Sequence, residues 1–304
     1  MKSSSGIIYA LANLQKFREL LDLPSRILFK LRNELKEYKS EKSSNELIKS
    51  DSENLEYAHY VSEVVQDKDK LKKFRRPYKY RQILEHVNWV NGERYLDRYF
   101  TLGGSKEDLM KLSAEDWVGK PRKYFYPGYG WLSTTQIRYL AVREEMRGIF
   151  NFEEIETIGE IGCGFGGQFL SLSHLETIKT YSFYDLIDVQ RIIQYYLSNF
   201  AFSTKTLFPE VSKIEAKKFD LVISNYAFSE LPRIVQLEYV EKILSNSVRG
   251  YMIMNSGLNN KTRRNNGKLS LSEIRSLMPW INTLAEVPLT GPDNYVIYWD
   301  RSKG

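Results

Sequence analysis

The 304-residue sequence contains one cysteine, Cys163, so no disulfide can form within the chain. A chain without disulfides is typical of a reducing compartment, and we therefore expect a cytoplasmic protein. Its three histidines, His59, His86 and His174, stand far apart, and none has the spacing of a zinc ligand set. No apolar run is long enough to span a membrane, and the N-terminus lacks a convincing signal peptide. We expect neither a membrane span nor a metal site built from histidine and cysteine.

The net charge of +6 is partly explained by a basic stretch in the first third of the chain. Seven Lys and Arg residues lie between residues 68 and 79, with Asp67 and Asp69 beside them. Such a stretch is either a solvated helix face or a surface that attracts nucleic acid, anionic glycan or anionic lipid. We take it as a solvated face, and a nucleic-acid partner is not expected.

Two regions are expected, a helical extension at residues 1–120 and an α/β domain at 121–304. Apolar spacing predicts helices in the extension at about residues 25–35, 55–73 and 78–90. Asn91-Gly92 should end the third helix, and Ser105 and Ser113, each three residues before an Asp, should start two more. The extension is expected to cap the acceptor site or to bind a partner.

An aromatic segment, RKYFYPGYGWLSTTQ at residues 122–136, separates the two regions. Five rings around a Pro-Gly pair predict an irregular loop, which either packs over the core or lines a ligand site. Aromatic faces stack on sugars and bases and attract cations, so Tyr126, Tyr129 and Trp131 are candidate substrate-binding residues. Ser133 and Gln136 then predict the cap of a helix that continues to about Phe150.

From residue 157 onward strands alternate with helices, which indicates a parallel α/β sheet. Strands are predicted at residues 157–161, 180–184, 219–224, 250–255, 283–287 and 295–299, with one more unplaced strand between 200 and 218. Ser270, three residues before Glu273, predicts the start of a short helix. The predicted fold is a Rossmann-like, mostly parallel sheet with an antiparallel C-terminal strand.

The first of these strands leads into a glycine-rich turn, TIGEIGCGFGG at residues 157–167. Its glycines let backbone N–H groups approach a ligand, and the following helix N-terminus suits a carboxylate or a phosphate; they are Gly162, Gly164, Gly166 and Gly167. The G-x-G-x-x-G spacing, with Asp185 downstream, also satisfies the dinucleotide fingerprint, so NAD is an alternative ligand.

Three features resemble class I S-adenosylmethionine-dependent methyltransferases instead. Glu160 precedes the first glycine by two residues, FDLVISNYAFSEL follows as a fourth strand and loop, and the chain ends in two strands. Together with YPGYGWLSTTQIRYL, these motifs are similar to a family of sugar O-methyltransferases found beside surface-polysaccharide genes. The resemblance covers about residues 124–299. It implies S-adenosylmethionine as cofactor and a sugar, nucleotide-sugar or lipid-linked glycan as acceptor.

The chemistry of S-adenosylmethionine suits the residues of the turn. The loop amides and the helix N-terminus suit its carboxylate, and Glu160 suits its ammonium group. Asp185, at the end of the second strand, can accept both ribose hydroxyls. Asn225, at the end of the fourth strand, is the remaining candidate cofactor-binding residue.

Fewer residues can be assigned to catalysis and to binding of the acceptor. Many relatives place a His in the loop after the fourth strand, but residues 225–231 contain none, so Glu230 and Tyr226 are the catalytic candidates. We prefer Glu230 as general base, although a carboxylate near a helix N-terminus also explains it. Arg263 and Arg264 are candidates to hold a phosphate or an acidic sugar. A magnesium ion is an alternative without identifiable ligands.

Other functions are weighed against this one. An RNA or protein methyltransferase would suit the basic stretch, but the Pro-Pro run of base-modifying enzymes is missing from Asn225-Tyr226-Ala227-Phe228. An NAD-dependent oxidoreductase would use the same glycine turn. A non-catalytic scaffold would not require intact Glu160, glycines and Asp185.

Overall fold

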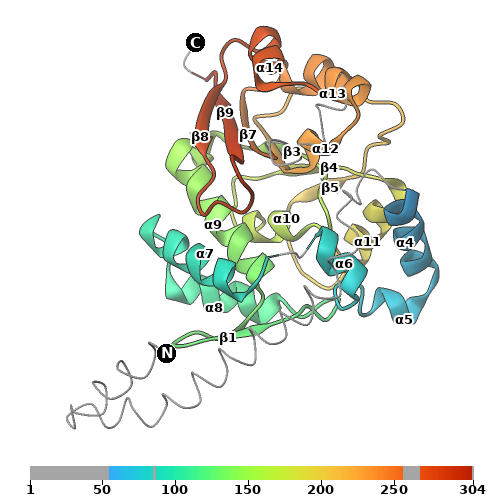
Figure 1. Cartoon of the computed structure of the whole chain (residues 1–304), viewed down its shortest axis with the longest axis vertical. Helices are drawn as coiled ribbons and strands as arrows, with labels where there is room; N and C mark the ends of the chain where they lie inside the picture. Colours follow the sequence, from blue (N-terminus) through green and yellow to red (C-terminus); the bar gives the residue numbers. More distant parts are fainter. Residues whose placement is uncertain (1–54, 85–86, 256–267, 303–304) are drawn as a thin grey trace, which may run out of the picture. The chain divides into compact units, whose positions relative to one another are not determined.

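The computed structural model describes residues 55–84, 87–255 and 268–302. The chain divides into two compact units, one formed by residues 50–123 and 132–304, the other by residues 1–49 and 124–131. The first unit contains the large sheet and is shown with the rest of the chain in Figure 1. Of the second unit, the described part is the segment Tyr124–Trp131. The predicted helix at 25–35 and linker at 39–53 lie outside the described residues.

Seven strands form the sheet, and their order departs from the chain order. From one edge to the other they are β5 (Lys205–Leu207), β4 (Thr180–Tyr184), β3 (Thr157–Ile161), β6 (Leu221–Asn225), β7 (Arg249–Met254), β9 (Tyr295–Asp300) and β8 (Asn282–Ala285). The first five pair in parallel, whereas β9 is antiparallel to both β7 and β8. The predicted fold class is confirmed, and β5 is the strand that the sequence left unplaced.

The order reverses at β3, which lies between β4 and β6. Gly159 pairs with Ser182 on one side and with Val222 on the other. The loops after β3 and β6 therefore leave the same edge of the sheet at its centre. In open α/β sheets, ligands bind outside the carboxyl ends of the strands at such a switch point.

Helices cover both faces of this sheet. Along the chain they are α4 (Leu55–Gln66), α5 (Lys68–Leu71), α6 (Tyr78–Ile83), α7 (Trp89–Thr101), α8 (Lys106–Glu115), α9 (Thr134–Ile149), α10 (Gly167–Leu172), α11 (Ile187–Leu197), α12 (Ala227–Glu230), α13 (Arg233–Tyr239) and α14 (Leu271–Leu277). A 3₁₀ turn at Phe152–Glu154 precedes β3, and a π-helical segment at Val240–Leu244 continues α13.

Alternating strand side chains build one apolar core on each face, because successive residues of a strand point to opposite sides. Phe183 of β4 packs with helices α4, α9, α10 and α11, whereas Tyr184 packs with the elements that carry Phe228, Tyr239 and Ile274. Val61 and Val64 of α4 are fully buried in the first core. Helix α4 is thus packed into the same unit as the sheet.

Local signals predicted some helix boundaries correctly and others not. Ser105 accepts a hydrogen bond from Asp108 N (3.1 Å) and caps α8, whereas Ser113 lies inside that helix and starts no new one. Ser133 caps α9, and Ser270 forms a capping box with Glu273. Asp67 divides the predicted helix at 55–73 by capping α5.

Two predictions in the first half of the chain are wrong. Asn91-Gly92 does not end a helix but lies in the first turn of α7, whose N-cap is Asn88 and whose Gly92 is buried. The aromatic segment is not irregular, since β1 (Tyr124–Tyr126) and β2 (Gly130–Leu132) form a hairpin. Its turn places Gly128 and Gly130 at positive φ, which glycine adopts without strain.

One member of the basic stretch is not on the surface. Arg75 is fully buried, and its guanidinium pairs with Asp116, donates to Ser133 Oγ (3.3 Å) and lies 4.2 Å from the centre of the Phe165 ring. Lys70 and Lys72, in turn, pair with acidic neighbours on the exposed side. The basic stretch therefore presents less unpaired positive charge at the surface than its sequence suggests.

Candidate functional site

The glycine turn after β3 is packed closely against the loop after β6. Gly162 has φ +72°, and a side chain there would lie 1.9 Å from Ala227 Cβ. Gly167, at the start of α10, likewise has the ring of Tyr139 where its Cβ would point, at 2.4 Å. Only glycine fits both positions. The turn, the start of α12 and helix α9 thus meet at the switch point.

Glu160 lies at the end of β3, directly beneath this turn. Its side chain is 1% exposed and accepts a hydrogen bond from Tyr181 Oη (2.8 Å). Burial raises the pKa of Glu160 to about 8, although the Tyr181 bond opposes the shift and nearby Asp185 adds to it. A cation that binds beside this carboxyl group would favour its ionised form and would supply the counter-charge that it lacks among the described residues.

Asp185 links the end of β4 to the glycine turn. One of its oxygens accepts hydrogen bonds from the backbone N–H groups of Cys163 (2.7 Å) and Gly164 (3.2 Å), and the other accepts from Leu186 N (2.8 Å). Burial raises its pKa to about 6, against the lowering effect of these three bonds. The second oxygen has one bond and can accept another from a ligand hydroxyl.

Asn225 ends β6 and faces the start of α10. Its Nδ2 donates to Gln168 Oε1 (3.3 Å), and Gln168 in turn donates to the carbonyl of Tyr139 (3.3 Å) and to Ser171 Oγ (2.9 Å). The Oδ1 atom of Asn225 is buried and has no partner among the described residues. A buried acceptor without a donor is costly, and a ligand N–H or O–H would satisfy it.

Arg138 of α9 is a residue that the sequence analysis did not select. It is 5% exposed, its guanidinium lies 5.2 Å from the ring of Tyr139 and 5.7 Å from that of Tyr226, and Nη1 has no partner. Within the described residues it makes no salt bridge. Gln136, two residues earlier in the same helix, is 1% exposed, and neither of its amide atoms has a partner among the described residues. A buried guanidinium without a counter-charge favours binding of an anion.

Tyr226 begins the loop after β6 in an unusual backbone conformation, with φ +69°. Its hydroxyl group donates to Glu286 and lies 3.1 Å from Thr290 Oγ1, and both partners belong to the turn between β8 and β9. Burial raises the pKa of Tyr226 well above its usual value. Non-glycine residues at positive φ cluster at functional sites, and Glu286, another residue missed from sequence, holds this one in place.

Glu230, the preferred base, ends α12 beside the end of β7. Its Oε1 accepts a hydrogen bond from Asn255 Nδ2 (2.8 Å). Ser229 Oγ donates to the carbonyl of Tyr226 (2.6 Å) and accepts from Asn255 N (3.1 Å), so the loop is fixed to β7. Glu230 is half-buried and retains one oxygen for another donor.

The predicted substrate-binding residues are placed only in part. Tyr126, Tyr129 and Trp131 belong to the β1–β2 hairpin, where the rings of Phe125 and Trp131 meet edge to face at 5.8 Å. Arg263 and Arg264 lie outside the described residues.

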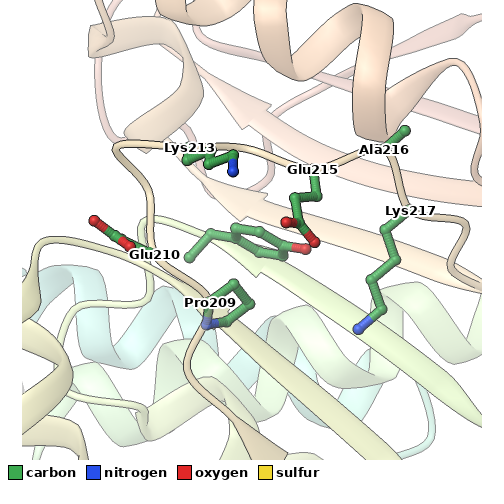
Figure 2. Close-up of a pocket in the computed structure, with 7 residues that line it drawn as sticks. Pro209, Glu210, Lys213, Glu215, Ala216 and Lys217 are labelled. Atoms are coloured by element: carbon green, nitrogen blue, oxygen red, sulfur yellow. The ribbon is translucent and has the colours of Figure 1, made fainter.

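A cavity of about 280 Å³ lies beside the end of β4 (Figure 2). It is lined by Tyr184 and by the segment before β6, namely Pro209, Glu210, Lys213, Glu215, Ala216 and Lys217. No glycine of the turn and no predicted cofactor-binding residue lines it. Lys217, whose pKa is lowered by burial, donates instead to Ser182 Oγ (3.3 Å) within β4.

Neither a metal site nor a membrane span is found in the described part of the chain. No three His, Cys, Asp or Glu side chains there are grouped so that they could hold a metal ion. His174 lies 3.3 Å from Glu115, and His59 lies 3.3 Å from Glu63. Within the same ranges, no helix is both long and apolar enough to cross a bilayer.

No family model matches the sequence, and no curated relative does so either. Matches among solved structures include the 16S rRNA methylase ArmA (18% identity, 70% of this chain and 98% of that one, TM-score 0.39). Others are an S-adenosylmethionine-dependent methyltransferase from Clostridium acetobutylicum (8% identity, 52% and 88%, TM-score 0.40) and PigF with SAH (11%, 54% and 59%, TM-score 0.38). The match spans about three fifths of the length of PigF. All three structures are less than 20% identical to this chain, with TM-scores below 0.5.

Proposed function

We propose that the protein is an S-adenosylmethionine-dependent methyltransferase that transfers a methyl group to a hydroxyl group of a sugar or glycan. The observation that carries the proposal is a set of unsatisfied groups around one glycine turn. Among the described residues, Arg138 is a buried cation without a counter-charge and Asn225 Oδ1 is a buried acceptor without a donor, while Glu160 is a carboxyl group with a raised pKa.

The donor offers a partner for each of these groups. Its carboxylate suits Arg138 and the amides at the start of α10, and its ammonium group suits Glu160 and Asn225. Its ribose hydroxyls suit the second oxygen of Asp185. NAD fits less well, because it lacks a carboxylate and an ammonium group, and because its pyrophosphate would lie above the carboxyl group of Glu160.

When bound, S-adenosylmethionine supplies an electrophilic methyl carbon and a thioether leaving group. The protein's part is to hold the acceptor oxygen in line with that carbon and to take up its proton. The acceptor forms its O–C bond as the C–S bond breaks, and the proton passes to Glu230, our preferred base. Tyr226 is the second catalytic candidate in the same loop.

The acceptor class rests on the family resemblance. Tyr129 and Trp131 can offer aromatic faces on which a sugar ring stacks, whereas Tyr126 is 1% exposed and offers none. Arg263 and Arg264 would hold its phosphate or acid group. The same resemblance supports a proposed role in surface-polysaccharide biosynthesis, and the single cysteine supports a proposed cytoplasmic location. Burial of Arg75 weakens the case for RNA, since the basic stretch loses a surface charge.

The test is methyl transfer from tritiated S-adenosylmethionine by the full-length protein. Nucleotide sugars, lipid-linked glycans and structured RNA are offered separately, and labelled product is expected in a sugar fraction. Glu230→Gln should lower turnover on that acceptor strongly while the affinity for S-adenosylhomocysteine is unchanged. Label in RNA alone would contradict the sugar acceptor, and full turnover by Glu230→Gln would contradict the proposed base.

A further inference from the structure

Three side chains from the segment 55–84 lie against the glycine turn or its flanks. A Cβ on Gly164 would be 3.6 Å from Leu84 Cδ2, at the end of α6. Arg75 lies over the ring of Phe165, the next residue of the turn, at 4.2 Å. Tyr57, in the first turn of α4, packs against the core that contains Cys163 and Phe165. The outer side of the turn is therefore covered by protein.

Helix α4 also covers the neighbouring loop. It packs against α11, the helix that begins two residues after Asp185, and both are seen together in Figure 1. Burial raises the pKa of Tyr57 well above its usual value, and the charges of Asp185 and Glu230 contribute to the shift. Asp185 directly follows β4, and Glu230 lies in the segment after β6. These two strands flank β3 in the sheet. Tyr57 is thus within electrostatic range of the loops after β4 and β6.

The described side chains at the start of α4 are less buried than those in its middle. Val61 and Val64 are fully buried in the core, whereas Tyr57 is half-buried and its neighbours Ala58 and His59 are exposed. The middle of α4 is therefore anchored in the core, and part of Tyr57 stays accessible to a ligand.

We propose that Tyr57 and Leu84 form the outer wall of the donor pocket over its adenosine half. The inference rests on the proposed function, because it assigns walls to the same cofactor site. It also gives the helical extension a role in donor binding, next to the predicted role as a cap over the acceptor.

The experiment compares two ligands and three variants by titration calorimetry. S-adenosylhomocysteine and 5′-methylthioadenosine share the adenosine half, but only the first has the amino-acid half. Tyr57→Ala should weaken both by a similar factor of about ten, as expected when one aromatic contact and one hydrogen bond are lost. Tyr57→Phe tests the hydroxyl group alone. Tyr60→Phe, on the same helix, is the matched control and should bind both ligands as the wild type does.

Hydrogen exchange supplies a readout that a merely structural role would not move. Added S-adenosylhomocysteine should slow exchange of the amides in the first turn of α4 and leave those of α8 unchanged. If Tyr57→Ala binds both ligands with wild-type affinity and exchange in α4 does not respond, the inference is wrong while the donor site stands. If the wild-type protein binds neither ligand, the proposed function itself fails.

Discussion

Replacing Arg138 by methionine separates a ligand-binding role from a structural one. The substitution removes the charge but keeps an unbranched apolar side chain of similar length. Arg138 has no carboxylate partner within the described residues, so its removal breaks no ion pair. Exchanging a buried charge for a well-packed apolar side chain is often neutral or stabilising. We therefore expect the ligand-free variant to melt at the wild-type temperature or slightly above it.

Ligand binding should change in the opposite direction. A hydrogen bond to a charged group contributes about 1.5–3 kcal/mol, so losing the contact to the donor carboxylate should weaken S-adenosylhomocysteine about 10- to 150-fold. 5′-Methylthioadenosine lacks that carboxylate, and its affinity should stay the same. Titration calorimetry with both ligands measures the difference directly. Unchanged affinity for S-adenosylhomocysteine would refute the assignment of Arg138 to the donor carboxylate.

Further predictions concern the pH dependence of binding, the stability of the fold and the base. Burial holds the pKa of Glu160 near 8, and an ammonium group prefers the ionised carboxylate, so affinity for S-adenosylhomocysteine should rise between pH 6 and pH 8 by up to about tenfold per unit. Glu160→Gln should lose this dependence, and calorimetry across that range checks it. Arg75→Met leaves Asp116 buried without a partner and should lower the free energy of unfolding by about 3–5 kcal/mol, measured by denaturant titration. A loss below 1 kcal/mol would show that the pair is replaceable. Glu286→Gln should accelerate exchange of the amide hydrogens in the loop after β6, because it weakens the bond that holds Tyr226; equal exchange rates would contradict that role.

Much of the fold could be predicted because its strands carry local signals. Buried apolar runs and a following turn mark β3, β4, β6 and β7, and these four build the centre of the sheet. The exception, β5, has three residues of which none is buried, so neither burial nor length distinguishes it from a loop. Its place is fixed by pairing with β4, which is tertiary information.

Helix ends were predicted where a side chain caps its own helix and missed where packing decides. Ser105, Ser133 and Ser270 each bond a backbone N–H three residues ahead, and that spacing is visible in sequence. Asn91-Gly92 carries a turn signal, but the buried Gly92 lies in α7, which packs along α9. Tertiary packing outweighed the local preference there.

The residues of the candidate site were likewise predicted where a sequence motif marks them and missed where only tertiary packing brings them to the site. Glu160 and the glycines form one continuous motif, and Asp185 follows the next strand, so spacing alone brings them together. Arg138, Tyr57 and Glu286 come from α9, from α4 and from the β8–β9 turn, and none has a motif of its own. Helix α9 carries four other charged residues, Arg143, Glu144, Glu145 and Arg147, so its sequence alone does not single out Arg138.

The central claim is that the glycine turn binds S-adenosylmethionine, and titration calorimetry of the full-length protein tests it most directly. S-adenosylhomocysteine and NAD are titrated separately at pH 8, where Glu160 is about half ionised. We expect S-adenosylhomocysteine to bind with one-to-one stoichiometry and NAD to produce no saturable heat. Saturable binding of NAD without binding of S-adenosylhomocysteine would contradict the account.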